Sequence, residues 1–346
     1  MKAVKALLLV PFVFYQLAMG VQRHVASDGT GTAEEGTTWA TAINIDTLEK
    51  VLETTVVAGD VFFVKGGTYT IISEINASAT PGTKTNPISL IGVKPTTSHE
   101  GDQITYTDWA VDSVDMPLFQ LASVKLVTGN YYRLYNLHCQ GDIAYTVTAA
   151  SYSIVYNCYF NQTHNSAQRR YVLSISNSTC VLGCVFRSAL NNGIFSGNYN
   201  LIKDCLFRQN KTGIFASAGS VLISNVFTSC STGISLEGYD YGRLLNNTFY
   251  GCTVAISGTD GDGWLINDNI IANSAAAGVS WITQTNSNMY VNNHLHGNAV
   301  NFIGVDTVGI YSDHLVTTGD PLFRNPPDSL QLQTTSPCIN TGSGPR

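Results

Sequence analysis

The side chains best suited to chemistry lie in two polar stretches, LEGYDYGR (236–243) and GTDGDGW (258–264). Their carboxylates would face each other across a bound sugar, as a glycoside hydrolase requires. Their aromatic rings would stack on the apolar faces of sugars. The D-G-D-G run would also offer oxygen ligands to calcium at Asp260 and Asp262, although a full EF-hand loop is missing. The candidate glycan-binding residues of this region are Glu237, Tyr239, Asp240, Tyr241, Asp260, Asp262 and Trp264.

A second group of candidates is cationic. A β-eliminating lyase needs a base and a cation that stabilises the enolate, and Lys203, Arg208 and Lys211 are the candidates for these roles. Arg187 and Arg208 each directly follow a phenylalanine, so they are expected to stack one above the other on neighbouring coils. Their guanidinium groups are expected to point outward on one face and to bind a glycan. The alternative is that both arginines are solvated on a polar face.

Histidines and cysteines give weaker signals. His294 and His296 form an H-x-H pattern that places both rings on one face of a strand, but no third metal ligand accompanies them. His138 is aligned with the phenylalanine positions of the repeated segments and is therefore predicted to pack in the core rather than to act as a base. Cys230 and Cys252 each lie three residues after a phenylalanine, so a disulfide between them is left open.

Composition excludes several classes of protein. Of the 346 residues, 12% are charged and 44% hydrophobic, and the net charge is −6 with no run of Lys or Arg. Nucleic-acid binding requires clustered positive charge and is disfavoured. The high apolar content argues against disorder.

The N-terminus has the layout of a secretion signal. Lys2 and Lys5 precede an apolar run from Ala6 to about Phe14, and small residues follow at Ala18 and Gly20. Residues 1–20 are therefore predicted to be a signal peptide, the alternative being an ordered apolar segment. The run is too short to span a bilayer comfortably, so the mature chain is expected to have no transmembrane helix.

An internal repeat determines the predicted fold. One column contains Cys158, Cys184, Cys205, Asn225, Asn247 and Asn269, at steps of 26, 21, 20, 22 and 22 residues. Two residues after each member comes Phe160, Phe186, Phe207, Phe227, Phe249 or Ile271. A third column begins Gly193, Gly213 and Gly233, where glycine would suit tight corners. Coils this short, with β-branched strands, predict an all-β, single-stranded right-handed parallel β-helix of about 8–10 rungs.

The ends predict caps. We expect an N-terminal cap over 21–60, the β-helix over 61–300 and a C-terminal capping segment over 301–346. In the first cap a helix would bury Leu48, Val51 and Leu52, with Asp46 and Glu49 as its capping pair.

These end segments resemble those of a known superfamily. Three segments are similar to the start and finish of secreted β-helix proteins of the pectin-lyase-like superfamily. They are HVASDGTGTAEEGTTWATA and AGDVFFVKGGTYTI near the N-terminus and GDPLFRNPPDSLQLQTTSPCINTG at the C-terminus. The resemblance implies polysaccharide partners. Its members include lyases, glycoside hydrolases, phage tailspikes and non-catalytic surface proteins, and the tailspikes suggest a homotrimer by analogy of fold alone.

Two functions remain open. The absence of polygalacturonase-like NTD, HG and RIK motifs and of long lateral loops favours a non-catalytic, glycan-facing protein of the extracellular or virion surface. Such a protein would need no cofactor, unless calcium binds. Its partners would be cell-surface glycans or neighbouring surface proteins. The alternative is a secreted lyase or hydrolase that acts on a uronate-containing glycan.

Overall fold

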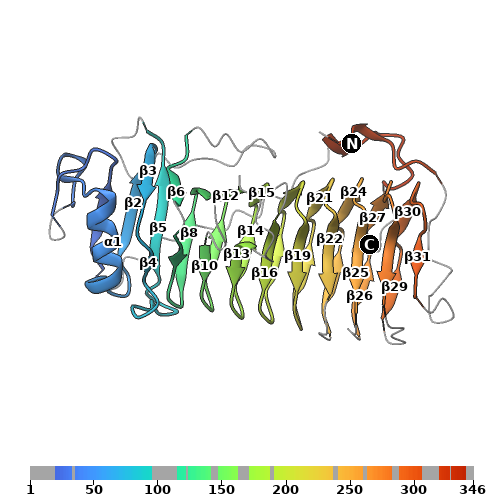
Figure 1. Ribbon diagram of the computed structural model, residues 1–346, viewed down its shortest axis with the longest axis horizontal. Coiled ribbons are helices and arrows are strands. Elements are labelled where there is room, and N and C mark those ends of the chain that lie inside the picture. The colour runs from blue at the N-terminus through green and yellow to red at the C-terminus, as the bar shows by residue number, and fades with distance from the viewer. Residues whose placement is uncertain are drawn as a thin grey trace.

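The predicted parallel β-helix is confirmed. The computed structural model describes residues 20–32, 36–95, 115–121, 124–141, 147–162, 171–187, 191–236, 241–259, 263–282, 288–305, 319–327 and 329–339. Its strands form three parallel sheets of 11, 10 and 10 strands, here sheets A, B and C, to which successive coils contribute in turn. The strands stack along one axis in Figure 1, with the first helix at one end.

The strand bounds follow the repeat. Sheet A contains β1 (Gln22–Val25), β2 (Val61–Lys65), β5 (Ile88–Val93), β8 (Tyr132–Tyr135), β11 (Ile154–Tyr156), β14 (Cys180–Leu182), β17 (Leu201–Lys203), β20 (Val221–Ile223), β23 (Arg243–Leu245), β26 (Leu265–Asn267) and β29 (Met289–Val291). Sheet B contains β3 (Thr68–Ile71), β6 (Leu118–Leu121), β9 (His138–Gly141), β12 (Tyr159–Gln162), β15 (Val185–Arg187), β18 (Leu206–Arg208), β21 (Val226–Thr228), β24 (Thr248–Tyr250), β27 (Ile270–Ala272) and β30 (His294–His296). Sheet C contains β4 (Ile75–Asn76), β7 (Leu126–Val127), β10 (Val147–Ala149), β13 (Tyr171–Ile175), β16 (Asn192–Ser196), β19 (Thr212–Ala216), β22 (Thr232–Leu236), β25 (Val254–Gly258), β28 (Ala277–Trp281) and β31 (Phe302–Ile303).

The phenylalanine column forms a continuous stack in the core. The rings from Phe160 to Phe249 lie 4.7–5.0 Å apart between centroids on successive rungs and are within 9° of parallel. All five are at most 1% exposed, because side chains alternate across each strand and this position points inward. The stack thereby sets the register of sheet B, since a one-residue slip would turn every ring outward.

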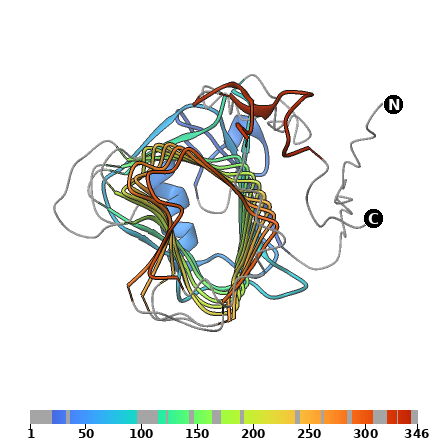
Figure 2. The same ribbon diagram turned by 90° about the vertical axis from the view of Figure 1, so that its right-hand side faces the viewer.

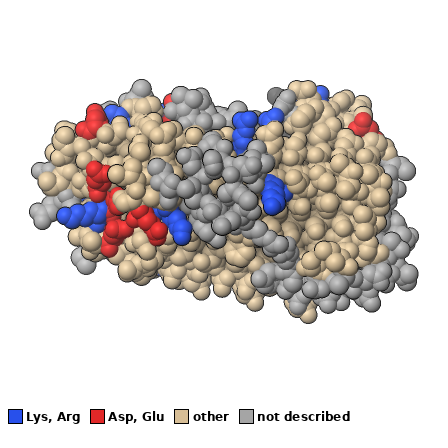
Figure 3. All heavy atoms as spheres, in the orientation of Figure 1, with Lys and Arg blue, Asp and Glu red and all other residues tan. Residues whose placement is uncertain are grey.

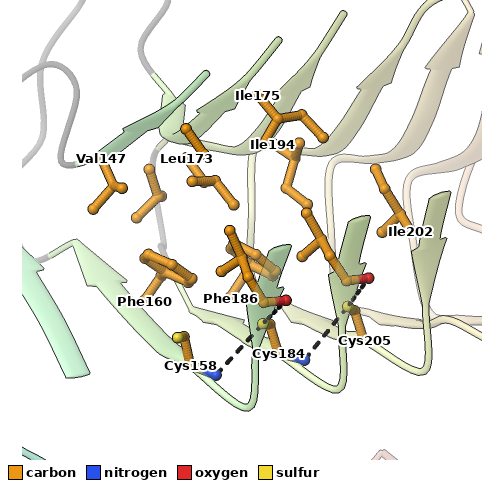
Figure 4. Close-up of a cluster of buried hydrophobic side chains, with 14 of the residues drawn as sticks. Val147, Cys158, Phe160, Leu173, Ile175, Cys184, Phe186, Ile194, Ile202 and Cys205 are labelled. Atoms are coloured by element: carbon orange, nitrogen blue, oxygen red, sulfur yellow. Dashed lines mark hydrogen bonds between the residues drawn. The ribbon is translucent and has the colours of Figure 1, made fainter. Parts of the chain in front are cut away.

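The thiol and asparagine column is also continuous. The backbone N–H of Cys158 donates to Sγ of Cys184, and that of Cys184 to Sγ of Cys205, each at 3.4 Å (Figure 4). From Cys205 onward the acceptor is an asparagine Oδ1 on the next rung, at 2.9–3.0 Å, and the series extends to Asn293. A side chain on each rung thus satisfies a buried backbone donor of the previous rung.

The glycine column has a different cause from the one predicted. Gly193, Gly213 and Gly233 lie near the start of sheet C strands and not at corners with positive φ. A Cβ on Gly213 would lie 2.7 Å from the Phe227 ring and 2.5 Å from the carbonyl O of Gly233. Glycine is required because the ring and backbone of the next rung fill the space.

The N-terminal end is closed by α1 (Ile45–Thr54), which follows a short 3-10 helix at Trp39–Thr41. Figure 2, a view along the axis, shows α1 lying across the far end of the coils. Leu48, Val51 and Leu52 are buried as predicted. The predicted capping pair is wrong, because Asn44 caps the helix by accepting a hydrogen bond from the Thr47 N–H (2.9 Å), and Glu49 instead accepts one from Ser73.

A buried ion pair ties the first strand to this cap. Nη1 of Arg23 lies 2.9 Å from Oδ2 of Asp60, whose side chain is fully buried. Asp60 also accepts hydrogen bonds from the backbone N–H groups of Val21 (2.7 Å) and Val57 (3.1 Å). Because β1 pairs with β2, sheet A begins inside the segment assigned to the cap, 21–60. The predicted signal segment lies outside the described residues up to residue 19.

The C-terminal segment returns along sheet B. Its strands β32 (Phe323–Asn325) and β33 (Ser329–Leu332) pair antiparallel and appear in red at the top of Figure 1. Phe323 packs edge-on against Tyr250 at 5.6 Å, and Nε2 of His294 donates to the carbonyl O of Gly319 (2.9 Å). The segment therefore covers the outer face of sheet B at its later rungs.

The structure also shows the state of the cysteines and whether any described helix could cross a membrane. All eight cysteines are free thiols, including Cys230 and Cys252. In the part of the chain that the structure describes, no helix combines the length and apolar character needed to cross a membrane.

Candidate functional site

A column of hydrogen-bonding side chains runs along the outer face of sheet B. Its members occupy equivalent positions on successive strands and pair in register from β6 to β21. They are Gln120, Gln140, Asn161, Arg187, Arg208 and Thr228. We call this set the sheet B column. It contains two cations and no carboxylate, so it is suited to an anionic ligand that extends along the axis.

Arg187 and Arg208 are direct neighbours within this column. They are paired in register between β15 and β18, as the sequence predicted. The preceding residues, Phe186 and Phe207, are fully buried, so alternation directs the guanidinium groups outward. Arg187 is exposed and Arg208 is partly buried. A guanidinium group binds a carboxylate through two parallel hydrogen bonds, which favours glycans that carry uronate groups.

An apolar and aromatic column flanks the arginines on the same face. His138 and Tyr159 are paired on β9 and β12, and their rings meet edge to face at 4.7 Å. The expectation that His138 belongs to the phenylalanine column is wrong, because Cys139 aligns with Phe160 there. The two rings lie beside Gln140 and Asn161, whereas the apolar Val185 and Leu206 lie beside the two arginines. Of the rings, His138 is only 9% exposed, so Tyr159 offers the larger surface to a sugar.

The lysines proposed for catalysis do not join this face. Lys203 lies at the end of β17 in sheet A, with Nζ 3.6 Å from Oδ2 of Asp204. Burial raises the pKa of Asp204, and the neighbouring Lys203 partly offsets that effect. Lys211 is exposed in the turn between β18 and β19. The three lyase candidates thus belong to two different sheets and a turn, and the fold does not gather them on one sheet.

The acidic region is described only in part. Glu237, Tyr239, Asp240, Asp260 and Asp262 lie outside the described residues. Tyr241 is 76% exposed. The prediction that Trp264 forms a surface platform is wrong. Its ring is fully buried and fills the space above Gly242, where a Cβ would come within 2.0 Å of it.

Sequence reasoning missed a set of exposed tyrosines that share their position with Tyr241. Tyr131, Tyr152 and Tyr199 lie in the same turn, between sheets C and A. A signal was present, because Tyr152, Tyr199 and Tyr241 each precede the Cys/Asn column by six residues. The same register places Ser178, Gly219 and Gly263 at this turn on the other rungs, which hid the pattern.

Charge is sparse over much of the molecule. On the face shown in Figure 3, acidic and basic side chains gather at the N-terminal end, and few appear over the later rungs. At the far end, His294 and His296 both flank the inward Leu295, as the H-x-H pattern predicted. Burial lowers the pKa of His294.

Solved structures share this architecture. Pectate lyase Pel9A superposes with a TM-score of 0.55 at 13% identity, over 95% of this chain and 93% of that chain. A PL6 family polysaccharide lyase from Pseudopedobacter saltans gives 0.54 at 15% identity, over 82% of this chain and 65% of that one. A rhamnogalacturonan lyase gives 0.50 at 13% identity, over 81% and 74%. These similarities show that the chain shares the right-handed parallel β-helix fold of these pectate lyase-like structures.

A match to a protein-family model identifies the family of this chain. The model described as "Periplasmic copper-binding protein (NosD)" matches residues 119–321, and the chain belongs to this family. A comparison with curated proteins finds no match.

The described residues do not fit a copper site. Among them, no three His, Cys, Asp or Glu side chains come together in a way that would hold a metal ion. The buried thiols of Cys158 and Cys184 donate to backbone carbonyls, and burial raises their pKa well above the ordinary value. Metal binding requires the thiolate, which this environment disfavours.

Proposed function

We propose that this chain is a non-catalytic glycan-binding protein that acts outside the cytoplasm, in the periplasm or at the cell exterior. In this proposal the sheet B column holds an acidic polysaccharide, with Arg187 and Arg208 on its carboxylates. The observation that carries the proposal is the register pairing of these two arginines in a column of hydrogen-bonding side chains. The polysaccharide lyases of the same fold and the periplasmic family description are consistent with it.

The spacing of the column suits a polymeric ligand. Neighbouring rungs of a parallel sheet are about 4.8 Å apart, so the five side chains from Gln120 to Arg208 span about 19 Å. Thr228, at the end of the column, is only 2% exposed and is not counted. Each rung presents one polar group, and a glycan chain presents its groups at similarly regular intervals. We therefore expect contacts along several sugar units rather than a pocket around one.

A catalytic role has less support. Elimination beside a uronate needs a base close to the cation that stabilises the enolate. Lys203 faces outward from sheet A beside Asp204, whereas Arg208 faces outward from sheet B. This separation favours binding over the lyase alternative.

The proposal is tested by measuring binding and cleavage together. Purified protein is run through native gels that contain polygalacturonate or alginate, and the same mixtures are assayed for unsaturated sugar products. We expect retarded migration without product formation. Release of unsaturated products would establish the lyase alternative, and unretarded migration in both gels would exclude acidic-glycan binding.

A further inference from the structure

Four tyrosines occupy one position of the turn that leads from sheet C into sheet A. Tyr131, Tyr152, Tyr199 and Tyr241 have φ between 58° and 62°, in the left-handed region. Three of them are among the most exposed large side chains described, at 52% for Tyr152, 68% for Tyr199 and 76% for Tyr241. We call these four residues the tyrosine corner.

The fold does not require tyrosine at this position. The left-handed region is unfavourable for L-residues with bulky side chains and is tolerated by glycine and asparagine. Equivalent turns on other rungs use Ser178, Gly219 and Gly263, with φ of 57°, 67° and 73°. Since these exposed rings contribute little to the core, their strained conformation suggests a role at the surface.

The rings are held in place by neighbouring rungs. Tyr131 and Tyr152 stack with centroids 4.9 Å apart and planes within 12°. The ring of Tyr199 lies over Gly219, where an added Cβ would come within 2.3 Å of Cδ1. Tyr241 lies over Gly263 in the same way, at 2.7 Å. These contacts preorganise the rings and reduce the ordering cost on binding a ligand.

On the rungs of Tyr131, Tyr152 and Tyr199 the residues beside the turn are polar but uncharged, whereas Asp240 directly precedes Tyr241 in the sequence. Asn130, Ser151, Asn177 and Asn198 directly precede the turn position on their rungs. Oδ1 of Asn177 accepts a hydrogen bond from the N–H of Asn198 (2.8 Å), which fixes its amide. Aromatic faces beside neutral amides and hydroxyls match the apolar faces and hydroxyl groups of uncharged sugars.

We infer that the tyrosine corner binds an uncharged polysaccharide, with pyranose rings packed on the parts of the tyrosine rings that the neighbouring rungs leave exposed. Tyr131 and Tyr241 are five rungs apart, about 24 Å at about 4.8 Å per rung, so the ligand is an extended chain. A ligand with repeating units fits a surface built from repeating rungs. This site lies at a different edge of the coil from the sheet B column and is independent of the acidic-glycan proposal.

Replacing Tyr199 with asparagine tests the inference. Asparagine tolerates the left-handed region, so Tyr199→Asn removes the ring without straining the turn. The probes are xylan, galactomannan and hydroxyethyl cellulose in native affinity gels. We expect at least one of them to retard the wild type, and Tyr199→Asn to weaken that binding at least fivefold with an unchanged or higher melting temperature. The matched control is Ile72→Ser, which removes a 75% exposed side chain at the N-terminal end and is expected to leave retardation unchanged.

Other results would overturn the inference. If none of the three neutral polysaccharides retards the wild type, or if Tyr199→Asn binds as the wild type does, the corner is not the proposed site. A lower melting temperature with unchanged retardation would assign the tyrosine a structural role instead. The sheet B variants Arg187→Gln and Arg208→Gln should leave neutral-glycan retardation intact, so the two proposals fail separately.

Discussion

The ring of Phe227 fills the space that a side chain on Gly213 would need, with Cδ1 2.7 Å from the position of an added Cβ. The same relationship links Gly193 to Phe207 and Gly233 to Phe249. Glycine on sheet C and phenylalanine on sheet B therefore form one packing unit that repeats along the axis. A substitution in either column is therefore expected to disturb the packing of the other column.

This unit predicts a specific loss of stability. Gly213→Ala should lower the free energy of unfolding by about 1–3 kcal/mol, because a well-packed core must shift to accept the methyl group. Adding Phe227→Leu should cost less in this variant than in the wild type, since a smaller side chain relieves the clash with the ring, although the clash with the carbonyl O of Gly233 remains. Denaturant unfolding of the two single variants and the double variant measures this coupling.

Gly251→Ala is the matched control for that series. Nothing lies within 4 Å of a Cβ at Gly251, although its φ of 62° is left-handed. The alanine should cost only the strain of that conformation, about 1 kcal/mol. Purely additive effects of Gly213→Ala and Phe227→Leu would contradict the packing account.

The asparagines of the thiol and asparagine column predict a second loss of stability. Oδ1 of Asn247 accepts from the backbone N–H (2.9 Å) and Nδ2 (3.0 Å) of Asn225, and its own Nδ2 donates to Leu222 O (2.9 Å). Asn247→Ala leaves these buried groups unpaired, so unfolding should become easier by about 3 kcal/mol. Asn246→Gly, at the adjacent exposed turn position with φ of 54°, should be nearly neutral. Equal effects of the two variants in denaturant unfolding would show that the asparagine hydrogen bonds contribute little to the free energy of unfolding.

The buried thiols predict a dependence on alkaline pH. Burial raises the pKa of Cys139, Cys158, Cys184 and Cys230 well above the ordinary value of 9.0. These thiols stay protonated in the folded chain but ionise in the unfolded chain, which then binds fewer protons. Their contribution to stability is complete well below pH 9 and falls as the pH rises through and above 9, by about 1.4 kcal/mol per thiol at pH 10.

Thermal unfolding between pH 8 and pH 10.5 measures this effect. Cys184→Ala should be less stable at pH 8 but should lose less stability than the wild type as the pH rises. If the melting temperatures of the wild type and Cys184→Ala fall in parallel with rising pH, the Cys184 thiol does not contribute to the pH dependence of stability. Intact mass before and after reduction tests the free state of Cys230 and Cys252, with no change expected.

The repeat was predictable because parallel coils place equivalent residues above one another. A column of Cys or Asn and a column of Phe two residues later fix both the register and the inward face, and every ring from Phe160 to Phe249 lies where the spacing placed it. The outward direction of Arg187 and Arg208 followed from the same alternation.

Other features depended on contacts between rungs that spacing does not encode. Trp264 is buried because Gly242 on the preceding rung leaves room for its ring. The helix is capped by Asn44 rather than by the Asp46–Glu49 pair because the turn before α1 places the Asn44 side chain on the Thr47 N–H. The tyrosine corner was missed because left-handed tyrosines are rare and alternate with serine and glycine.

The most direct measurement is calorimetric titration of polygalacturonate into the wild type and into Arg187→Gln/Arg208→Gln at low and high salt. We expect the double variant to bind at least tenfold more weakly, because two charge-assisted contacts are lost. Added salt should weaken the wild type more than the variant. Lys50→Gln, which removes an exposed charge on α1, is the control and should bind normally. Equal affinity of the wild type and the double variant would contradict the assignment of the sheet B column as a glycan-binding surface.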